Sequence, residues 1–296
     1  MTRNLLRTSR ETLTFLALVS VNVLLIGAFT FYPLWQGIQL SFYQWDFISA
    51  FKLWVGLKNY VRLWNDPIFW QILRNTFIFT ICTVSLTLGI ALTLALTLSL
   101  PLRGRELVRG VVFLPTLLSG AAIALVFNYI LDDRYGLVQQ ILRVFGGQSP
   151  SFYTHPVWAM VGVIVTMVWK NAGYAAVILI AGLQSIDHTL YEAAAIDGAG
   201  RRARLWYITL PSLAPMILFT VVTGILGTFQ SFDIIRVMTN GGPVNATNVL
   251  VYHLYERGFV NFEAGPAGAI TVIIFVIMLV LTILQLQVGK HTNAHE

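Results

Sequence analysis

Long apolar runs alternate with short polar segments along the whole chain. A transmembrane helix needs about 20 consecutive, mostly apolar residues. The charge-free runs that reach this length are Thr12–Leu34, Thr76–Leu100, Gly110–Leu131, Ile208–Phe232 and Ala267–Val288. A further run, Val157–Leu183, is interrupted only by Lys170. The pattern therefore predicts six membrane-spanning helices.

The composition agrees with this prediction. Of 296 residues, 56% are hydrophobic and 11% are charged, and the mean hydropathy of +0.72 exceeds that of soluble domains. No charge-rich or Gly/Ser-rich linker divides the chain. We expect an all-α integral membrane protein with an N-terminal segment at 1–11, one six-span domain at 12–288 and a tail at 289–296.

The basic residues indicate the orientation of the chain. They gather in three clusters: Arg3, Arg7 and Arg10; Arg103, Arg105 and Arg109; and Arg201, Arg202 and Arg204. If six helices alternate, all three clusters lie on one side, and the positive-inside rule places both termini in the cytoplasm. The net charge of +6 forms no single basic patch, which argues against nucleic-acid binding.

A polar segment between the fourth and fifth spans, EAAAIDGAGRRARLWYITLP at 192–211, predicts a short helical hairpin. Thr189 and Glu192 have the spacing of a capping box that begins a helix, and Gly198 can end it. Pro211 stands where the next apolar run begins, and a missing amide costs little there. We expect this loop, residues 187–211, to lie in the cytoplasm.

The same segment resembles the EAA signature of permease subunits of binding-protein-dependent ABC importers. That signature is Glu-Ala-Ala, three residues, Gly, nine residues, then Ile-x-Leu-Pro. The matching positions are Glu192, Ala193, Ala194, Gly198, Ile208, Leu210 and Pro211. The resemblance implies the type I importer permease fold, in which this loop is a coupling helix that docks into a separate ATPase subunit.

Further motifs resemble the carbohydrate-uptake branch of that family. They are GLKNY at 56–60, LRNT at 73–76, Leu114-Pro115, GLQSI at 182–186, Phe229-Gln230 and NGGP at 240–243. Residues 241–259 are similar to the corresponding loop of sn-glycerol-3-phosphate permeases. The likeness covers nearly the whole chain.

The resemblance also implies partners and a division of labour. The expected partners are a second homologous permease subunit, two ATP-binding subunits that form a homodimer, and an extracytoplasmic solute-binding protein. ATP and Mg²⁺ would be bound by the ATP-binding subunits. In this chain Lys290 follows a glycine, but His291 stands where a phosphate-binding loop needs Ser or Thr. We therefore expect no ATPase activity and no cofactor in the chain itself.

Four polar residues in or near the spans are candidates for the translocation pathway. A charge at membrane depth costs roughly 3 kcal/mol on insertion scales and by default faces protein or water, so Lys170 and its neighbour Asn171 are the first pair. The alternative for Lys170 is a structural contact or a side chain that extends to the interface. Gln230 and Asp233 stand at the outer end of the fifth span, which the resemblance implies lines the route. Stabilisation of a loop is the alternative for Asp233.

Other polar and aromatic residues have structural interpretations. We expect Asn22 and Asn128 to bond neighbouring helices, because lipid offers no partners. Cys82 can form no intrachain disulfide, and no group of histidines has the spacing of a metal site. The aromatic residues of FYQWDF at 42–47 and of a predicted surface helix within 55–70 suit membrane-interface anchoring. Stacking on a sugar is the alternative that we leave open for them.

The function that best fits these observations is a permease subunit of an ATP-driven importer that works by alternating access in the inner membrane. The expected cargo is sn-glycerol 3-phosphate, with an oligosaccharide as the alternative. Composition alone also permits an ion-coupled secondary transporter. Proton coupling usually needs an ionisable group in the spans, and no Asp or Glu lies inside any of the six apolar runs. A membrane-embedded enzyme is a third possibility, for which no catalytic set can be assigned.

Overall fold

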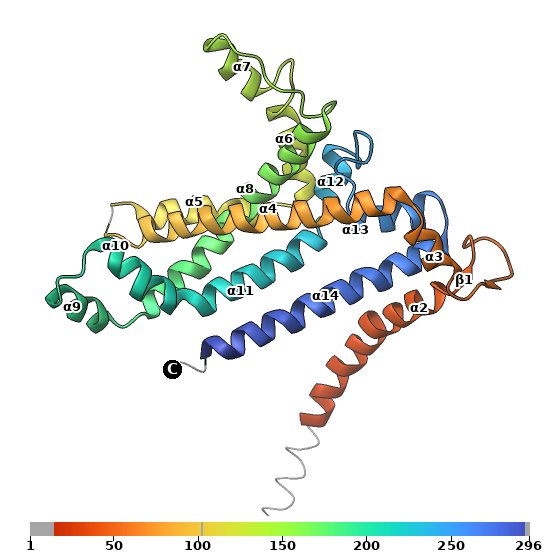
Figure 1. The fold of residues 1–296 in the computed structure, drawn as a ribbon, viewed down its shortest axis with the longest axis horizontal. Coiled ribbons are helices and arrows are strands. Elements are labelled where there is room, and N and C mark those ends of the chain that lie inside the picture. The colour runs from red at the N-terminus through yellow and green to blue at the C-terminus, as the bar shows by residue number, and fades with distance from the viewer. Residues whose placement is uncertain (1–14, 102, 294–296) are drawn as a thin grey trace, which may run out of the picture. The chain divides into compact units, whose positions relative to one another are not determined.

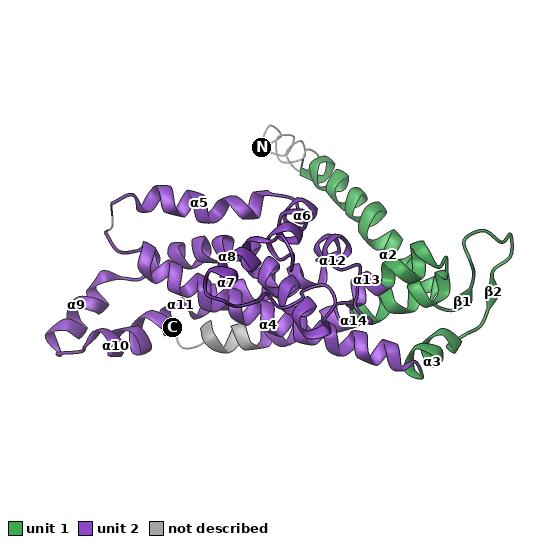
Figure 2. Ribbon diagram, turned by 90° about the horizontal axis from the view of Figure 1, so that it is seen from above, with its two compact units in different colours: residues 1–65, 254–275 green, residues 66–253, 276–296 purple. Residues whose placement is uncertain are grey.

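The structure, a computed structural model, describes residues 15–101 and 103–293. The predicted N-terminal segment at 1–11, with its arginine cluster, and the last residues of the predicted tail, 294–296, lie outside this range. The chain divides into two compact units, which Figure 2 distinguishes by colour. The first consists of residues 1–65 and 254–275, and the second of residues 66–253 and 276–296.

The first unit combines the first span with several short elements. Its span is Phe15–Leu40, which includes the π-helical turn η1 (Gly27–Phe31) and helix α2 (Tyr32–Leu40). The other elements are β1 (Tyr43–Gln44), β2 (Leu53–Trp54), α3 (Lys58–Trp64) and the π-helical turn η3 (Glu256–Val260). The two strands pair antiparallel, with Tyr43 opposite Trp54. No residue of 15–40 is buried.

The second unit contains most of the helices. They are α4 (Pro67–Leu98), α5 (Arg105–Leu117), α6 (Gly120–Ile130), α7 (Leu137–Val144), α8 (Pro156–Ser185), α9 (His188–Ile196), α10 (Arg201–Arg204), the π-helical turn η2 (Leu205–Thr209), α11 (Leu210–Phe229) and α12 (Phe232–Met238). Two helices have residues in both units: α13 (Leu250–Tyr255) and α14 (Ala264–Asn293), which continues past the predicted end of the sixth span. Figure 1 labels these elements along the chain.

Five helices of the described chain are long and apolar enough to cross a membrane, and the number is six if one bent pair counts as a single span. The second span begins earlier than predicted, at Pro67 instead of Thr76. The reason is local, since the Asp66 carboxylate accepts a hydrogen bond from the Ile68 amide at 2.9 Å and starts the helix. The predicted surface helix within 55–70 is accordingly limited to α3.

The prediction of one continuous third span at Gly110–Leu131 is wrong. The segment forms two helices, α5 and α6, bent by 103° at Leu118–Ser119. Pro115 lies inside α5 and has no amide to continue the helical ladder. Ser119 then starts α6, because its hydroxyl oxygen accepts a hydrogen bond from the Ala122 amide at 3.2 Å. A proline and a new cap four residues later explain the break.

The fifth span also begins earlier than predicted, at Arg201 instead of Ile208. Helix α10, the turn η2 and α11 follow one another without interruption, so Pro211 does not begin the helix. The wider i to i+5 turn of η2 ends two residues before Pro211, and its last bond runs from the Leu210 amide to the Leu205 carbonyl. Such a turn accommodates a residue that cannot donate a hydrogen bond.

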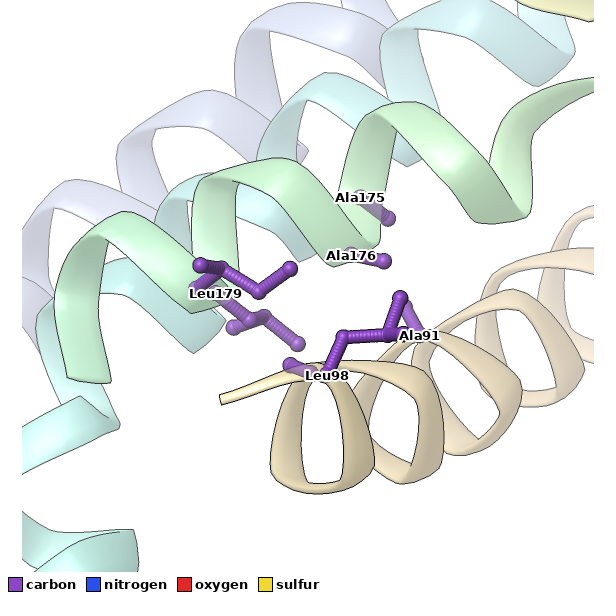
Figure 3. Close-up of a cluster of buried hydrophobic side chains, with 7 residues drawn as sticks. Ala91, Leu98, Ala175, Ala176 and Leu179 are labelled. Carbon is purple, nitrogen blue, oxygen red and sulfur yellow. The ribbon is translucent and has the colours of Figure 1, made fainter. Parts of the chain in front are cut away.

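Small residues bring α4 and α8 together. The buried cluster at their crossing consists of Ala91, Ala95, Leu98, Ala175, Ala176, Leu179 and Ile180, and Figure 3 shows it. In a membrane, helix association depends on close van der Waals packing rather than on exclusion of water, and small side chains permit it. The cluster is thus a close-packed contact between two of the candidate spans.

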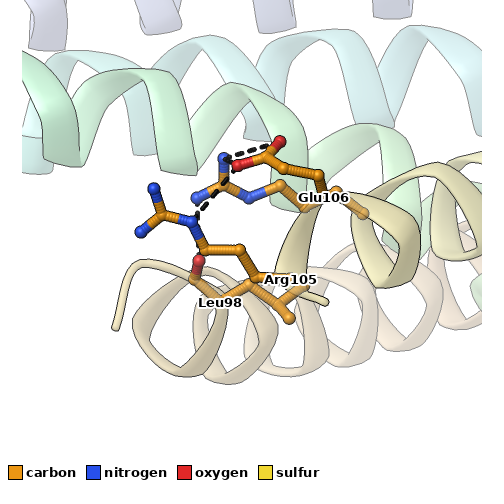
Figure 4. Close-up of polar contacts among 4 residues, drawn as sticks. Leu98, Arg105 and Glu106 are labelled. Atoms are coloured by element: carbon orange, nitrogen blue, oxygen red, sulfur yellow. Dashed lines mark hydrogen bonds and ion pairs between the residues drawn. The ribbon is translucent and has the colours of Figure 1, made fainter. Parts of the chain in front are cut away.

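The short link between α4 and α5 is closed by charged side chains (Figure 4). Arg109 donates a hydrogen bond to the Leu98 carbonyl oxygen at 2.7 Å, and its guanidinium also pairs with Glu106 at 3.2 Å. Arg105 pairs with the same carboxylate at 3.2 Å. A cation at the last carbonyls of α4 is favourable because the helix dipole is negative there. Two of the three arginines in this basic cluster therefore have structural partners.

Candidate functional site

The polar hairpin of the second unit begins at Asp187. The carboxylate of Asp187 accepts a hydrogen bond from the Thr189 amide at 2.9 Å, and α9 starts at His188. The predicted capping box of Thr189 and Glu192 is therefore wrong, because Asp is as good an N-cap as Thr and stands two residues earlier. The hydrogen bond from Thr189 is the main cause that lowers the pKa of the Asp187 carboxyl below its ordinary value.

The turn that ends α9 is built on Gly198. Its backbone has a φ of +74°, in the left-handed region that favours glycine. The Gly198 amide donates to the Ala195 carbonyl at 3.2 Å, and the Ala199 amide donates to the Ala194 carbonyl at 2.8 Å. These two bonds form a Schellman motif, which satisfies carbonyls at the end of a helix. The predicted sharp turn at Gly198 has this geometry.

Two side-chain contacts hold the hairpin closed. Arg204 donates from Nε to the Ala199 carbonyl oxygen at 2.8 Å, which joins α10 to the turn. The hydroxyls of Tyr191 and Thr209 share a hydrogen bond of 3.0 Å, which joins α9 to the turn η2. The hairpin is thereby fixed to the continuous helix Arg201–Phe229 at two points, and Figure 1 shows α9 and α10 beyond the ends of α8 and α11.

The residues of the predicted docking motif differ in exposure. Glu192, Ala193, Gly198 and Pro211 are exposed, whereas Ala194, Ile208 and Leu210 are half-buried. Helix α9 has no buried residue, and Ile196 is 87% exposed. The arrangement is a rigid projection with a partly apolar surface.

Lys170 and Asn171 lie in the middle of α8, and both are half-buried. The Thr116 hydroxyl donates to the Lys170 carbonyl oxygen at 3.1 Å, close to the break between α5 and α6. At Gly173, one turn further along α8, a methyl group would meet the Val112 carbonyl carbon at 2.6 Å. The backbones of α5 and α8 therefore touch beside the two candidate pathway residues.

Gln230 and Asp233 lie at the break between α11 and α12. Gln230 caps the end of α11 and is exposed. Asp233 is half-buried in the first turn of α12, and its carboxylate accepts a hydrogen bond from the Ile234 amide at 2.9 Å. That carboxylate also packs against Gly120, where an added methyl group would lie 2.6 Å from the Asp233 Cγ.

Helices α6 and α12 are joined by a second contact. Asn128 donates from Nδ2 to the Val237 carbonyl oxygen at 3.1 Å, as expected of an asparagine that bonds a neighbouring helix. The Tyr153 hydroxyl donates to the Asn128 carbonyl oxygen at 3.1 Å. Burial is the main cause that raises the pKa of Tyr153 to about 12, so this hydroxyl stays a donor. Asn22, in contrast, lies exposed on the first span.

Two of the resembling motifs are brought together by α4. Asn75 of the LRNT motif donates from Nδ2 to the Asn245 carbonyl oxygen at 2.7 Å, in the loop that follows NGGP. Thr76 accepts a hydrogen bond from the Leu250 amide at 3.0 Å. Asn75 and Thr76 are buried. These motifs therefore fix the loop of 240–250 to the start of the second span.

Sequence reasoning missed several residues that hold these sites. Asp187, Tyr191, Thr209 and Arg204 fix the hairpin, and Gly120 receives the Asp233 carboxylate. Asp187 had a sequence signal, since Asp directly before a helical pattern is an N-cap. Pro115 followed by Ser119 was a signal for the broken span.

Within the described ranges, no group of three or more His, Cys, Asp or Glu side chains is arranged to hold a metal ion.

Comparison with known proteins gives one family. Residues 85–293 match the model of the inner membrane component of binding-protein-dependent transport systems. A lactose transport system permease protein of Rhizobium radiobacter is 36% identical over 92% of this chain and 92% of that protein. An sn-glycerol-3-phosphate transport system permease protein of Brucella abortus is 34% identical over 90% of this chain and 92% of that protein.

Solved structures share the fold. One chain of a bacterial ABC transporter involved in the import of the acidic polysaccharide alginate superposes with a TM-score of 0.83, covering 97% of this chain and 99% of that chain at 24% identity. A second structure of an alginate transporter, in complex with a pentasaccharide-bound periplasmic protein, gives a TM-score of 0.80 over 94% and 93% at 24% identity. The helical arrangement is thus that of a type I importer permease.

Proposed function

The chain belongs to the family of inner membrane components of binding-protein-dependent transport systems, and we propose that it is one of two permease subunits in an ATP-driven importer of a sugar-like solute. As a multi-pass membrane permease, it would form half of the translocation pathway. A second, homologous permease subunit would form the other half. The positive-inside distribution of arginines supports a cytoplasmic location for both termini and for the hairpin.

The hairpin at 187–211 is the proposed contact with the ATP-binding subunits. Two observations support this proposal. Helix α9 has no buried residue, so its surface is free to meet a partner. The hydrogen bonds Tyr191–Thr209 and Arg204–Ala199 nevertheless fix the hairpin to the continuous helix Arg201–Phe229. A partner that pushes on Glu192 or Ala193 therefore moves the end of a transmembrane helix. A flexible loop would absorb such a movement instead.

The proposed transport cycle follows from a difference in ATP affinity between two conformations of the importer. A homodimer of ATP-binding subunits holds ATP and Mg²⁺. Its closure favours one orientation of the hairpins, one from each of the two permease subunits, over the other orientation. A ligand can shift a conformational equilibrium only by its difference in affinity for the two states. ATP binding would thus expose the pathway to the solute-binding protein outside, and hydrolysis would return it to the inward-open state.

The proposed cargo is sn-glycerol 3-phosphate, and an oligosaccharide is the second candidate. The sequence similarity of residues 241–259 to sn-glycerol-3-phosphate permeases supports the first, and the 34% identity to such a protein agrees with it. The 36% identity to a lactose permease protein supports the second. Lys170, Asn171, Gln230 and Asp233 are the proposed pathway residues, and an ammonium group at Lys170 suits either a phosphate or sugar hydroxyls.

Reversing the charge at Glu192, or adding a carboxylate at Gly198, tests the proposed docking of the hairpin. The whole importer, reconstituted in vesicles with its solute-binding protein, should lose uptake with Glu192→Lys or Gly198→Asp while the permease remains inserted. Asp197→Lys is the control, because Asp197 is equally exposed and lies outside the matched motif. Normal ATP-dependent uptake by the Glu192→Lys variant would contradict docking at the hairpin. Uptake driven by an ion gradient without ATP would contradict the importer class.

A further inference from the structure

An open pocket of about 760 Å³ lies within the first unit. Its walls come from the hairpin of β1 and β2, from α3 and from residues 261–266 before and at the start of α14. This volume falls in the range of small-molecule sites, about 300 to 1,000 Å³. The pocket belongs to segments that the span pattern places outside the membrane. Neither the hairpin at 187–211 nor any of the proposed pathway residues lines it.

The base of the pocket is firmly built. Asn59 is buried and donates from Nδ2 to the carbonyl oxygens of Ser41 at 2.8 Å and Tyr43 at 2.9 Å. A methyl group at Gly265 would lie 3.1 Å from the Asn59 Cγ, so α14 begins directly against this side chain. Glu263 pairs with Arg257 at 2.7 Å and with Arg62 at 3.3 Å. The walls are therefore held in place before any ligand arrives.

Aromatic rings reach the pocket from two sides. Phe51 is 89% exposed, and Phe262 is 48% exposed. Phe262 also adopts a φ of +56°, a left-handed conformation that is unfavourable for a non-glycine residue. The fold does not use either ring in its core. Strain that keeps an aromatic side chain at the edge of a pocket is a common property of ligand-binding sites.

The polar side chains of the pocket combine donors and acceptors without a net charge. Lys58 and Arg62 lie one turn apart on the same face of α3, and the carboxylates of Asp46 and Glu263 balance their charges. The amide side chains of Gln44 and Asn261 are lining groups as well. A neutral set of amides, carboxylates and cations beside aromatic rings suits a ligand with many hydroxyl groups. An anionic lipid headgroup would favour uncompensated cations.

We propose that this pocket binds a saccharide or sugar-like polyol of the same class as the cargo, through residues other than those proposed for the translocation pathway. The ring faces of Phe51 and Phe262 stack on the apolar face of the ligand. Gln44, Asn261 and Lys58 bond its hydroxyl groups. The proposal rests on the proposed function, because the ligand class is that of the imported solute.

Protection of an introduced cysteine tests occupancy of the pocket directly. In a Cys82→Ala background, which removes the only native cysteine, Ser49→Cys, at an exposed pocket-lining position that the proposed ligand contacts do not use, is labelled from outside by a water-soluble maleimide in the reconstituted importer. The probes are lactose, maltose, trehalose and sn-glycerol 3-phosphate, and the cargo is whichever of them the wild-type importer takes up. That cargo, at about twice its Kd or more, should slow labelling about threefold or more, because an occupied pocket does not admit the reagent. Ile48→Cys, 78% exposed in the same loop but outside the pocket walls, is the control and should be unaffected.

Transport kinetics give a second readout. Asn261→Ala should raise the KM for cargo about threefold to tenfold with little change in kcat, because one hydrogen bond to the ligand is worth about 0.5–1.5 kcal/mol. Gln39→Ala, an exposed amide on α2 outside the pocket, is the matched control. A higher requirement for the solute-binding protein at saturating cargo would instead identify a protein-docking surface. An effect that appears only when anionic lipid is removed would identify a lipid site.

The outcomes separate this inference from the proposed function. If the wild-type importer takes up none of the four probes, the proposed function fails and the inference fails with it. If it takes up one of them and that probe leaves labelling of Ser49→Cys unchanged, only the inference is overturned. Either of the two alternative kinetic results also overturns it.

Discussion

The carboxylate of Asp233 packs against the backbone of Gly120, so that α12 meets the first residue of α6 without an intervening side chain. Negative charge is favourable at this position because the helix dipole is positive at the N-terminus of α6. The contact joins the two places where transmembrane helices of the second unit break. Glycine is required there by the closeness of a neighbour, and its φ is not in the left-handed region.

Gly120→Ala should destabilise the permease by about 1–3 kcal/mol, the usual cost of forcing an extra carbon into a filled space. Asp233→Ala removes the obstructing carboxylate and should restore most of that loss in the double variant. Gly89→Ala on α4 is the control, since an added methyl group there has no neighbour within 4 Å. Thermal unfolding of the purified protein measures all four. Additive effects of the two substitutions would show that the contact carries no coupling energy.

Gly198 should tolerate only residues that accept a positive φ. Gly198→Asn is expected to retain most uptake, because Asn adopts the left-handed conformation more readily than other residues. Gly198→Val should lose more, since a left-handed φ costs a β-branched residue at least about 1–2 kcal/mol. The space around Gly198 is open, so side-chain size alone cannot explain a difference. Gly200→Ala, at a φ of −70°, should behave as the wild type. Equal uptake by the Asn and Val variants would count against a fixed turn.

The Tyr191–Thr209 hydrogen bond should couple ATP hydrolysis to transport. Tyr191→Phe and Thr209→Val each remove one hydroxyl, and the coupling energy in a double-mutant cycle should be about 0.5–1.5 kcal/mol. If the hairpin transmits movement, either variant should hydrolyse more ATP per solute imported. The ratio of hydrolysis to uptake in vesicles measures this loss. An unchanged ratio in both single variants would assign the bond to local stability alone.

The start of α9 should depend on the ionisation of Asp187. Its pKa is lowered because the charged carboxylate accepts the Thr189 amide, so the stabilisation is fully present above the pKa of the unfolded chain, about 3.9. It is lost as the pH falls through the lower pKa of the folded chain. Hydrogen exchange at the Thr189 amide should accelerate in acid relative to Asp187→Asn, in which the cap no longer titrates. Parallel pH profiles of wild type and variant would contradict this assignment.

Lys170 should be reachable by water in at least one state of the transport cycle if it lines the pathway. Lys170→Cys in the Cys82→Ala background should react with a water-soluble thiol reagent, and the rate should change when ATP is bound. Thr166→Cys is the control on the same helix, because Thr166 has no exposed surface and should stay unlabelled. Protection of Lys170→Cys in every state would favour a purely structural role for the lysine.

The sequence predicted those features that depend on neighbouring residues. Six apolar runs, the turn at Gly198 and the interhelical role of Asn128 all follow from local chemistry, and the structure agrees with the last two. The break at Leu118–Ser119 was also local, but the apolar run around Pro115 concealed it. Hydropathy indicates whether a segment is apolar enough for lipid. It does not indicate whether the helix keeps one direction along that segment.

Contacts between segments that are distant in the sequence could not be predicted from neighbouring residues. Gly120 and Asp233 are ordinary residues in their own segments, and only the fold brings them together. The same holds for Asn75, whose amide bonds the loop after NGGP. With one sequence, a motif can be recognised by resemblance, but its partner within the chain cannot be named. Hydrogen bonds such as Tyr191–Thr209 depend on how two helices cross, which periodicity does not determine.

The continuous helix Arg201–Phe229 has a geometric consequence. Its 29 residues extend about 43 Å at 1.5 Å each, which exceeds the hydrocarbon thickness of about 30 Å. Trp206 and Tyr207 are 66% and 82% exposed, and their residue types are those enriched at membrane interfaces. The helix is thus a lever that is longer than the hydrocarbon layer is thick, so one end of it extends into the aqueous phase. A tilt of about 10° would displace one end of the helix by about 7 Å relative to the other, so a small rotation of this helix gives a large displacement at its end.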